Sequence, residues 1–99
     1  MFFITCFTKV SIDELGYPDI GSSRTVGFVD TLEEAGELLL NNACDFWETI
    51  YEYAIIEEIH SGIYPVPEDR CFFQFDMDRQ GYRPIEEPKE LERVAIFAF

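Results

Sequence analysis

Glu57 and His60 carry the side chains whose types and spacing could serve acid–base chemistry in this sequence. His60 is the only histidine, and it follows Glu57 closely in the segment YEYAIIEEIH. If residues 51–60 form a strand, Glu57 shares a face with Tyr53 and Ile55, which we expect to face the core. A buried carboxylate needs a partner or a raised pKa, and such groups are often functional. One hypothesis is therefore a small enzyme or ligand-binding domain that uses Glu57, His60 and nearby tyrosines.

Glu57 also has a structural interpretation, and this is the one we favour. The carboxylate could lie at a sheet edge, or it could pair with one of the seven Lys and Arg residues. A Cys–His pair would need a cysteine within hydrogen-bond reach of His60, and the sequence places none there. Motifs of serine hydrolases, phosphate-binding loops, dinucleotide-binding folds and zinc proteases are absent. We therefore predict that the protein is not an enzyme and has no catalytic residues.

The cysteines and acidic residues do not have the spacing of metal ligands. Cys6, Cys44 and Cys71 are scattered and form no CxxC pair, so with one histidine they do not make a zinc site. Asp76 and Asp78 form only a fragment of a calcium loop. Cys6 and Cys71 fall on apolar strand faces, where cysteine packs as a small hydrophobic residue. We predict free thiols, no metal and no cofactor.

The acidic residues are concentrated in one block of the chain. From Asp30 to Asp69 there are eleven carboxylates and not one Lys or Arg, in a chain whose formal net charge is −13. Binding to phosphate groups needs Lys and Arg to replace counterions, and the field of this block repels phosphate instead. The charge distribution therefore excludes nucleic acid as a direct partner.

The acidic block suggests a protein-interaction surface. Our preferred hypothesis is a non-enzymatic acidic module that meets a basic protein surface. Aromatic residues also gather here, and exposed aromatics with a charged rim are typical of protein interfaces. If they are buried instead, they belong to the core. A third hypothesis is a homodimer that pairs edge strands and has no other partner. The predicted partner-binding residues are Glu33, Glu34, Glu37, Asp45, Glu48, Glu52 and Trp47.

Length and composition indicate one folded domain, spanning residues 1–99. The chain of 99 residues is 47% hydrophobic and 16% aromatic, which is enough to build a core and unlike a disordered acidic tail. The opening MFFITCFTKV lacks the basic region of a signal peptide. No apolar run reaches the roughly 18–20 residues of a membrane span. We therefore expect a cytoplasmic protein that does not bind membranes.

The apolar periodicity predicts an α+β domain. Its mostly antiparallel sheet has about five strands, with one main helix packed on one face, because strands and helix do not alternate regularly. The order is strand, strand, helix and then three strands. Residues 44–50 fit either helix or loop. The predicted strands are 2–10, 24–30, 51–60, 71–78 and 94–99, the predicted loop and turn are 11–23 and 79–84, and a helical turn is expected near 88–92.

The predicted helix, residues 32–43, has the clearest local signals. Thr31 and Glu34 have the spacing of a capping box, and Asn41 and Asn42 suit the end of a helix. Its apolar face comprises Leu32, Ala35, Leu39 and Ala43, broadened by Leu38 and Leu40. The opposite arc holds Glu33, Glu34, Glu37 and Asn41. In the strand 71–78, we expect four residues to point inward, namely Cys71, Phe73, Phe75 and Met77, whereas Phe72 is an exception on the outward face.

The sequence also resembles a group of proteins as a whole. The segments that carry the resemblance are RTVGFVDTLEEAGELLLNNACDFWE, YEYAIIEEIHSGIYP and CFFQFD, within residues 24 to 76. They are similar to an uncharacterised family of small acidic proteins that are common in gut bacteria and their phages. The resemblance implies no activity or cofactor, but it suggests a phage or mobile-element accessory protein. The matching positions are Thr31–Ala35, Asn41, Asn42, Asp45, Glu48, Tyr53–Glu58, Gly62, Tyr64 and Phe72–Asp76.

Overall fold

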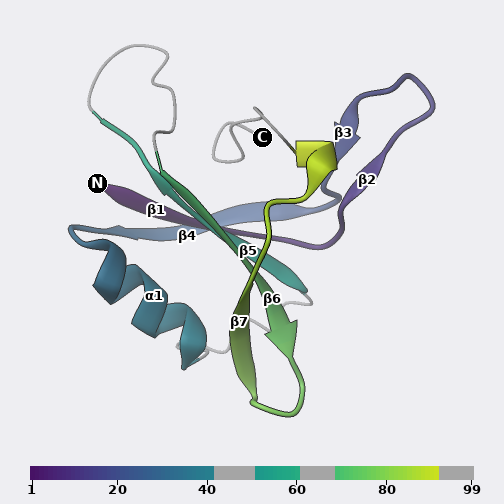
Figure 1. Cartoon of the computed structure of the whole chain (residues 1–99). Helices are drawn as coiled ribbons and strands as arrows, with labels where there is room; N and C mark the ends of the chain where they lie inside the picture. The colour runs from purple at the N-terminus through teal and green to yellow at the C-terminus, as the bar shows by residue number, and fades with distance from the viewer. Residues whose placement is uncertain (42–50, 61–68, 92–99) are drawn as a thin grey trace.

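Five antiparallel strands form one sheet, in the order β4-β1-β5-β6-β7 (Figure 1). The computed structural model describes residues 1–41, 51–60 and 69–91. The strands of the sheet are β1 (Phe2–Phe7), β4 (Ser23–Val29), β5 (Tyr53–Glu58), β6 (Arg70–Asp76) and β7 (Gly81–Ile85). The helix α1 (Leu32–Leu40) packs on one face. Two further strands, β2 (Ser11–Ile12) and β3 (Pro18–Asp19), form a small separate hairpin, and η2 (Lys89–Leu91) is a single turn of 3-10 helix.

Both faces of the sheet carry apolar cores. On the face covered by α1, here called the helix face, Ile4, Ile56 and Phe73 pack against Ala35 and Leu39. On the opposite side, here called the far face, five buried residues pack together, namely Phe7, Ile20, Ile55, Phe72 and Leu91. Figure 1 shows α1 on one side of the sheet and the hairpin and η2 on the other. The central strand β5 is apolar on both faces because it has neighbours on both edges and a layer over each face.

The helix begins as its sequence predicts. The Thr31 backbone is extended, and its Oγ1 accepts a hydrogen bond of 3.2 Å from the backbone N–H of Glu34. Asn41 is the C-cap, and its N–H donates to the carbonyl of Glu37. Ala35 and Leu39 are buried, as predicted. Leu32 and Leu40, however, are exposed, and they are the first and last residues of the helix. Their assignment to the core was wrong.

The fold class is confirmed, but several segments differ from prediction. The predicted loop 11–23 contains the β2–β3 hairpin, and the predicted turn 79–84 contains most of β7. Pro84 is tolerated in β7 because this strand lies at the edge of the sheet. The strand predicted at 94–99 and the ambiguous segment 44–50 lie outside the described residues.

Two side chains of the predicted strand 71–78 also differ from expectation. Met77 is exposed, because β6 ends at Asp76 and the chain then turns. Phe72 is buried, because the far face has its own core.

No helix in the described part of the chain is long and apolar enough to cross a membrane.

Candidate functional site

Glu57 lies fully buried on the far face, near the end of the central strand β5. The strand register places it between Phe3 of β1 and Arg70 of β6. The Nε atom of Arg70 lies 3.8 Å from Oε2 of Glu57, so the two charges interact across the strand pair without a short hydrogen bond between these atoms. The buried position of Glu57 and its pairing with a basic residue agree with the structural interpretation made from sequence.

Arg70 connects Glu57 to the segment that follows β7. Its Nη1 atom lies 3.0 Å from Oε1 of Glu87, and its Nη2 donates a hydrogen bond of 3.3 Å to the carbonyl of Leu91. The guanidinium also lies over the Phe72 ring, 5.1 Å from its centroid. The Arg70 side chain is nearly buried, whereas that of Glu87 is 41% exposed. Arg70 therefore acts as an electrostatic clamp that holds residues 87–91 against the far face.

The structure places Glu57 and His60 in different environments. His60 lies beyond the end of β5 and is exposed, whereas Glu57 is fully buried. The hydroxyls of Thr5 and Thr25 lie 3.0 Å apart on the same face of the sheet and bond to one another. The environment of Glu57 thus has the features of a structural ion pair. Within residues 1–41, 51–60 and 69–91, no three His, Cys, Asp or Glu side chains converge as metal ligands.

Two of the three cysteines can be placed in the structure. Cys6 and Cys71 are free thiols, and Cys6 is completely buried on the helix face. Burial raises the pKa of the Cys6 thiol to about 12, and it also raises the pKa of Cys71. Both groups are therefore protonated at neutral pH and have little nucleophilic character. Cys44 lies outside the described residues.

The raised pKa of Cys6 predicts a loss of stability at alkaline pH. The folded protein holds this proton more tightly, so the contribution is complete below the ordinary pKa of 9.0 and declines as the pH rises toward about 12. Between pH 8 and pH 10 the free energy of unfolding should fall by about 1.4 kcal/mol from Cys6 alone. Urea denaturation of Cys6→Ala should show a correspondingly shallower fall over this range. Equal slopes in the two proteins would contradict the assignment.

The predicted acidic surface is present on α1. Glu33, Glu34 and Glu37 are all exposed, on the arc opposite the buried residues. Among the side chains that the structure describes, none of these carboxylates forms an ion pair. The exposed apolar side chains of Leu32 and Leu40 lie on the same helix. The surface formed by the three carboxylates is here called the acidic helix face.

The remaining predicted partner-binding residues are only partly accounted for. Glu52 is half-buried, and its carbonyl accepts a hydrogen bond from Phe75. Tyr51 packs against the core of the helix face, and Tyr53 stacks on Phe7 on the far face. These two aromatics therefore belong to the core and do not form an exposed patch. Asp45, Trp47 and Glu48 lie outside the described residues.

Arg70 and Glu87 are the site residues that sequence reasoning missed. Arg70 is the first Lys or Arg after the acidic block that ends at Asp69, and this position could have marked it as a candidate partner for a carboxylate. Its partner could not be named, because the pairing depends on the register between β5 and β6.

Comparison with family models, with curated proteins and with solved structures found no match to this chain. A functional assignment must therefore come from the geometry and charge of the chain itself. The two candidate sites are the buried Glu57–Arg70 pair and the acidic helix face. The first has its charges compensated within the chain, whereas the second is open to solvent.

Proposed function

We propose that this protein is a non-enzymatic interaction module whose acidic helix face binds a basic surface on another protein. The observation that carries the proposal is the set of three exposed carboxylates, Glu33, Glu34 and Glu37, without ion pairs in the described part of the chain. Such carboxylates are available to Lys and Arg of a partner. Complementary charges accelerate association and select partners.

The local structure of α1 favours this role. The Thr31 cap satisfies a backbone N–H at the start of the helix, and Glu33 and Glu34 lie in the first turn, where the helix dipole stabilises negative charge. The carboxylates therefore stand on a helix that they help to stabilise. Leu40, which follows Glu37 by about one turn, adds exposed apolar area beside the charges. Acidic and apolar groups side by side can both contact a partner.

The resemblance noted from sequence gives the proposal a biological setting. In a phage or mobile-element accessory protein of the cytoplasm, a row of carboxylates can imitate nucleic-acid phosphates. The partner would then be a host or defence protein, with the acidic helix face in its nucleic-acid groove. This setting rests on charge and resemblance, and it makes the partner basic.

The two alternative hypotheses have less support. An enzyme that uses Glu57 would need the carboxylate accessible, whereas Glu57 is buried beside Arg70. A homodimer that pairs edge strands would use β4 or β7. Val26 interrupts the register of β4 with β1 as a bulge, and Pro84 lies within β7. Bulges and prolines at sheet edges both oppose the addition of another strand.

Affinity capture from the native host tests the proposal. Wild-type protein on beads should retain a basic host protein at low salt and release it as salt is raised, because screening weakens the attraction between exposed charges. Beads that carry the triple Glu→Gln variant at 33, 34 and 37 should retain much less of it. Capture of the same proteins by both beads would contradict a role for the acidic helix face.

A further inference from the structure

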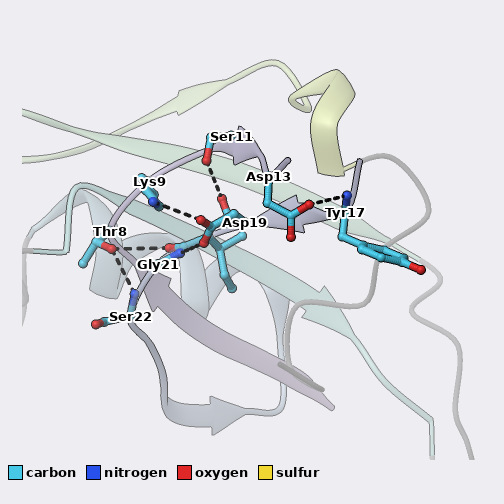
Figure 2. A network of polar contacts seen from close by, with 9 residues as sticks. Thr8, Lys9, Ser11, Asp13, Tyr17, Asp19, Gly21 and Ser22 are labelled. Atoms are coloured by element: carbon cyan, nitrogen blue, oxygen red, sulfur yellow. Dashed lines mark hydrogen bonds and ion pairs between the residues drawn. The ribbon is translucent and has the colours of Figure 1, made fainter. Parts of the chain in front are cut away.

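The turn that joins β2 to β3 has a fixed main chain. Oδ1 of Asp13 accepts hydrogen bonds of 2.9 Å from the backbone N–H groups of both Leu15 and Tyr17 (Figure 2 draws the second). The N–H of Asp13 donates to the Tyr17 carbonyl at 2.8 Å, and that of Gly16 donates to the Asp13 carbonyl at 3.0 Å. Gly16 has a φ of +85°, in the left-handed region that favours glycine. Asp13 thus organises the whole turn.

The base of the hairpin is anchored equally well. Lys9 Nζ lies 3.0 Å from Oδ2 of Asp19, whose Oδ1 accepts the Gly21 N–H at 2.9 Å (Figure 2). These two contacts lower the pKa of Asp19, so its carboxylate is ionised at neutral pH. Backbone bonds from Thr8 to the carbonyls on either side of Gly21, together with the buried side chain of Ile20, join the hairpin to the main sheet. The hairpin therefore extends from the main sheet and is attached to it at its base.

The large apolar side chains at the tip take no part in this bonding. Leu15 is 81% exposed, Tyr17 is 65% exposed and Ile12 is 48% exposed. Figure 2 shows the Tyr17 ring directed away from the polar network. Only the backbone groups of Leu15 and Tyr17 hold the turn. The chain thus presents large apolar groups to solvent on a main chain that is already ordered, which lowers the entropic penalty of binding.

We propose that this hairpin tip, residues 12–17, binds an apolar surface rimmed by Lys and Arg on a partner protein. Leu15 and Tyr17 are the anchors, and the exposed carboxylates of Asp13 and Glu14 face the basic rim. Figure 1 shows the hairpin and α1 at opposite sides of the molecule. The tip is therefore a second interface, which goes beyond the proposed function of the acidic helix face.

Charge selects this occupant over two others. A second copy of the chain would bring another net charge of −13 toward the acidic tip. An anionic membrane surface would repel the same carboxylates. A basic rim around an apolar surface complements both features of the tip at once. Tyrosine also supplies a large contact area with few rotatable bonds, which suits an anchor.

A defined probe makes the proposal testable. The probe is a short amidated helical peptide composed only of Leu and Lys, with its Leu stripe bordered by Lys. Amide chemical-shift mapping on the full chain should place the strongest changes at residues 12–17. Changes confined to α1, or the absence of any binding, would overturn the inference. Changes at α1 alone would leave the proposed function standing, so the two ideas fail separately.

Variants of the anchors give the affinity test. Replacing Leu15 and Tyr17 together with Ser should weaken binding of the peptide about tenfold or more, while the main-chain bonds of the turn remain. The matched control replaces Phe28 and Met77 with Ser, which removes two similarly exposed apolar side chains elsewhere. This control should bind as the wild type does. Equal weakening in both double variants would overturn the proposal.

Asp13 tests whether the ordered turn matters. Asp13→Ala removes the acceptor for two backbone N–H groups and should weaken the peptide, although every apolar side chain remains. Asp13→Asn keeps an acceptor oxygen for the turn but lacks the charge that faces the basic rim, so it should recover part of the loss. If both variants bind equally, the order of the turn contributes nothing and this part of the proposal fails.

Two further measurements exclude the other occupants. Wild-type protein should not sediment with phosphatidylcholine vesicles, and sedimentation velocity should show no concentration-dependent association. Vesicle binding that disappears in the Leu15/Tyr17 double Ser variant would assign the tip to lipid. Self-association that disappears in it would assign the tip to a second copy. Either result would overturn a protein partner with a basic rim.

Discussion

Replacing Arg70 with Met should lower the free energy of unfolding by about 3–5 kcal/mol, the range for breaking a buried ion pair by removing one partner. The Glu57 carboxylate would remain fully buried without its guanidinium, and the bond to the Leu91 carbonyl would also be lost. Methionine retains an unbranched apolar stem, so the loss reports the guanidinium and its contacts. Urea denaturation at neutral pH measures it.

Two further variants locate the origin of this loss. Glu87→Gln should cost less than about 1 kcal/mol, because the side chain is 41% exposed and its ion pair is screened by solvent. Replacing Glu57 with Gln together with Arg70 by Met also removes the buried negative charge, so the double variant should be more stable than Arg70→Met alone. If Arg70→Met stays within about 1 kcal/mol of wild type, the clamp is not a stability element.

The parts of the fold that follow from local signals were predictable from sequence. Thr31 and Glu34 mark the helix start through a bond between neighbouring residues. The two faces of β5 and β6 follow from the period of two residues in a strand, and the irregular order of strands and helix implied a mostly antiparallel sheet. Leu32 and Leu40 were misassigned because they are the two end residues of the helix, where periodicity does not show whether an apolar side chain meets the sheet or the solvent.

The parts that depend on distant contacts were not predictable. The β2–β3 hairpin has strands of two residues each, too short for any periodic signal. It is held instead by hydrogen bonds to side chains. Asp13 accepts one from the backbone N–H of Tyr17, and Thr8 accepts one from the backbone N–H of Ser22, fourteen residues away in sequence. In the sequence of β7, Gly81 and Pro84 indicate a turn. The segment is a strand in the structure, and its Tyr82 side chain is buried in the core. The Tyr82 hydroxyl donates to the carbonyl of Tyr51, a partner distant in sequence.

The candidate sites also differ in whether local sequence signals or distant contacts determine them. The acidic helix face was predictable, because helical periodicity alone separates Glu33, Glu34 and Glu37 from the buried arc. Burial of Glu57 was inferred from its strand face, but its partner Arg70 required the strand register. The hairpin tip was not anticipated at all. Its exposed Leu15 and Tyr17 look like ordinary loop residues until the bonds from Asp13 are known.

Changing Glu33, Glu34 and Glu37 together to Gln should weaken binding to the basic partner about tenfold or more at low salt. The loss should come mainly from slower association, because exposed charges steer encounter more than they retain a bound complex. The variant should remain folded, with a change in stability of less than about 1 kcal/mol, since all three side chains are on the surface. Thermal melting checks this condition first.

The matched control removes the same formal charge at a different place. Asp78, Glu86 and Glu90 are exposed and lie outside α1, so their replacement by Asn, Gln and Gln changes the net charge equally. Glu87 is kept, because its carboxylate pairs with Arg70. A difference between the two triples therefore reports the position of the charges and not their sum.

The most direct test of the central claim is the association rate constant of the captured basic partner with wild type and both triples, measured over a range of salt concentrations. The helix triple should associate about tenfold more slowly than wild type at low salt, with a shallower dependence on salt, while the control triple stays close to wild type. Equal slowing by the two triples would show that only net charge matters, and no slowing by either would show that the acidic helix face does not bind the partner.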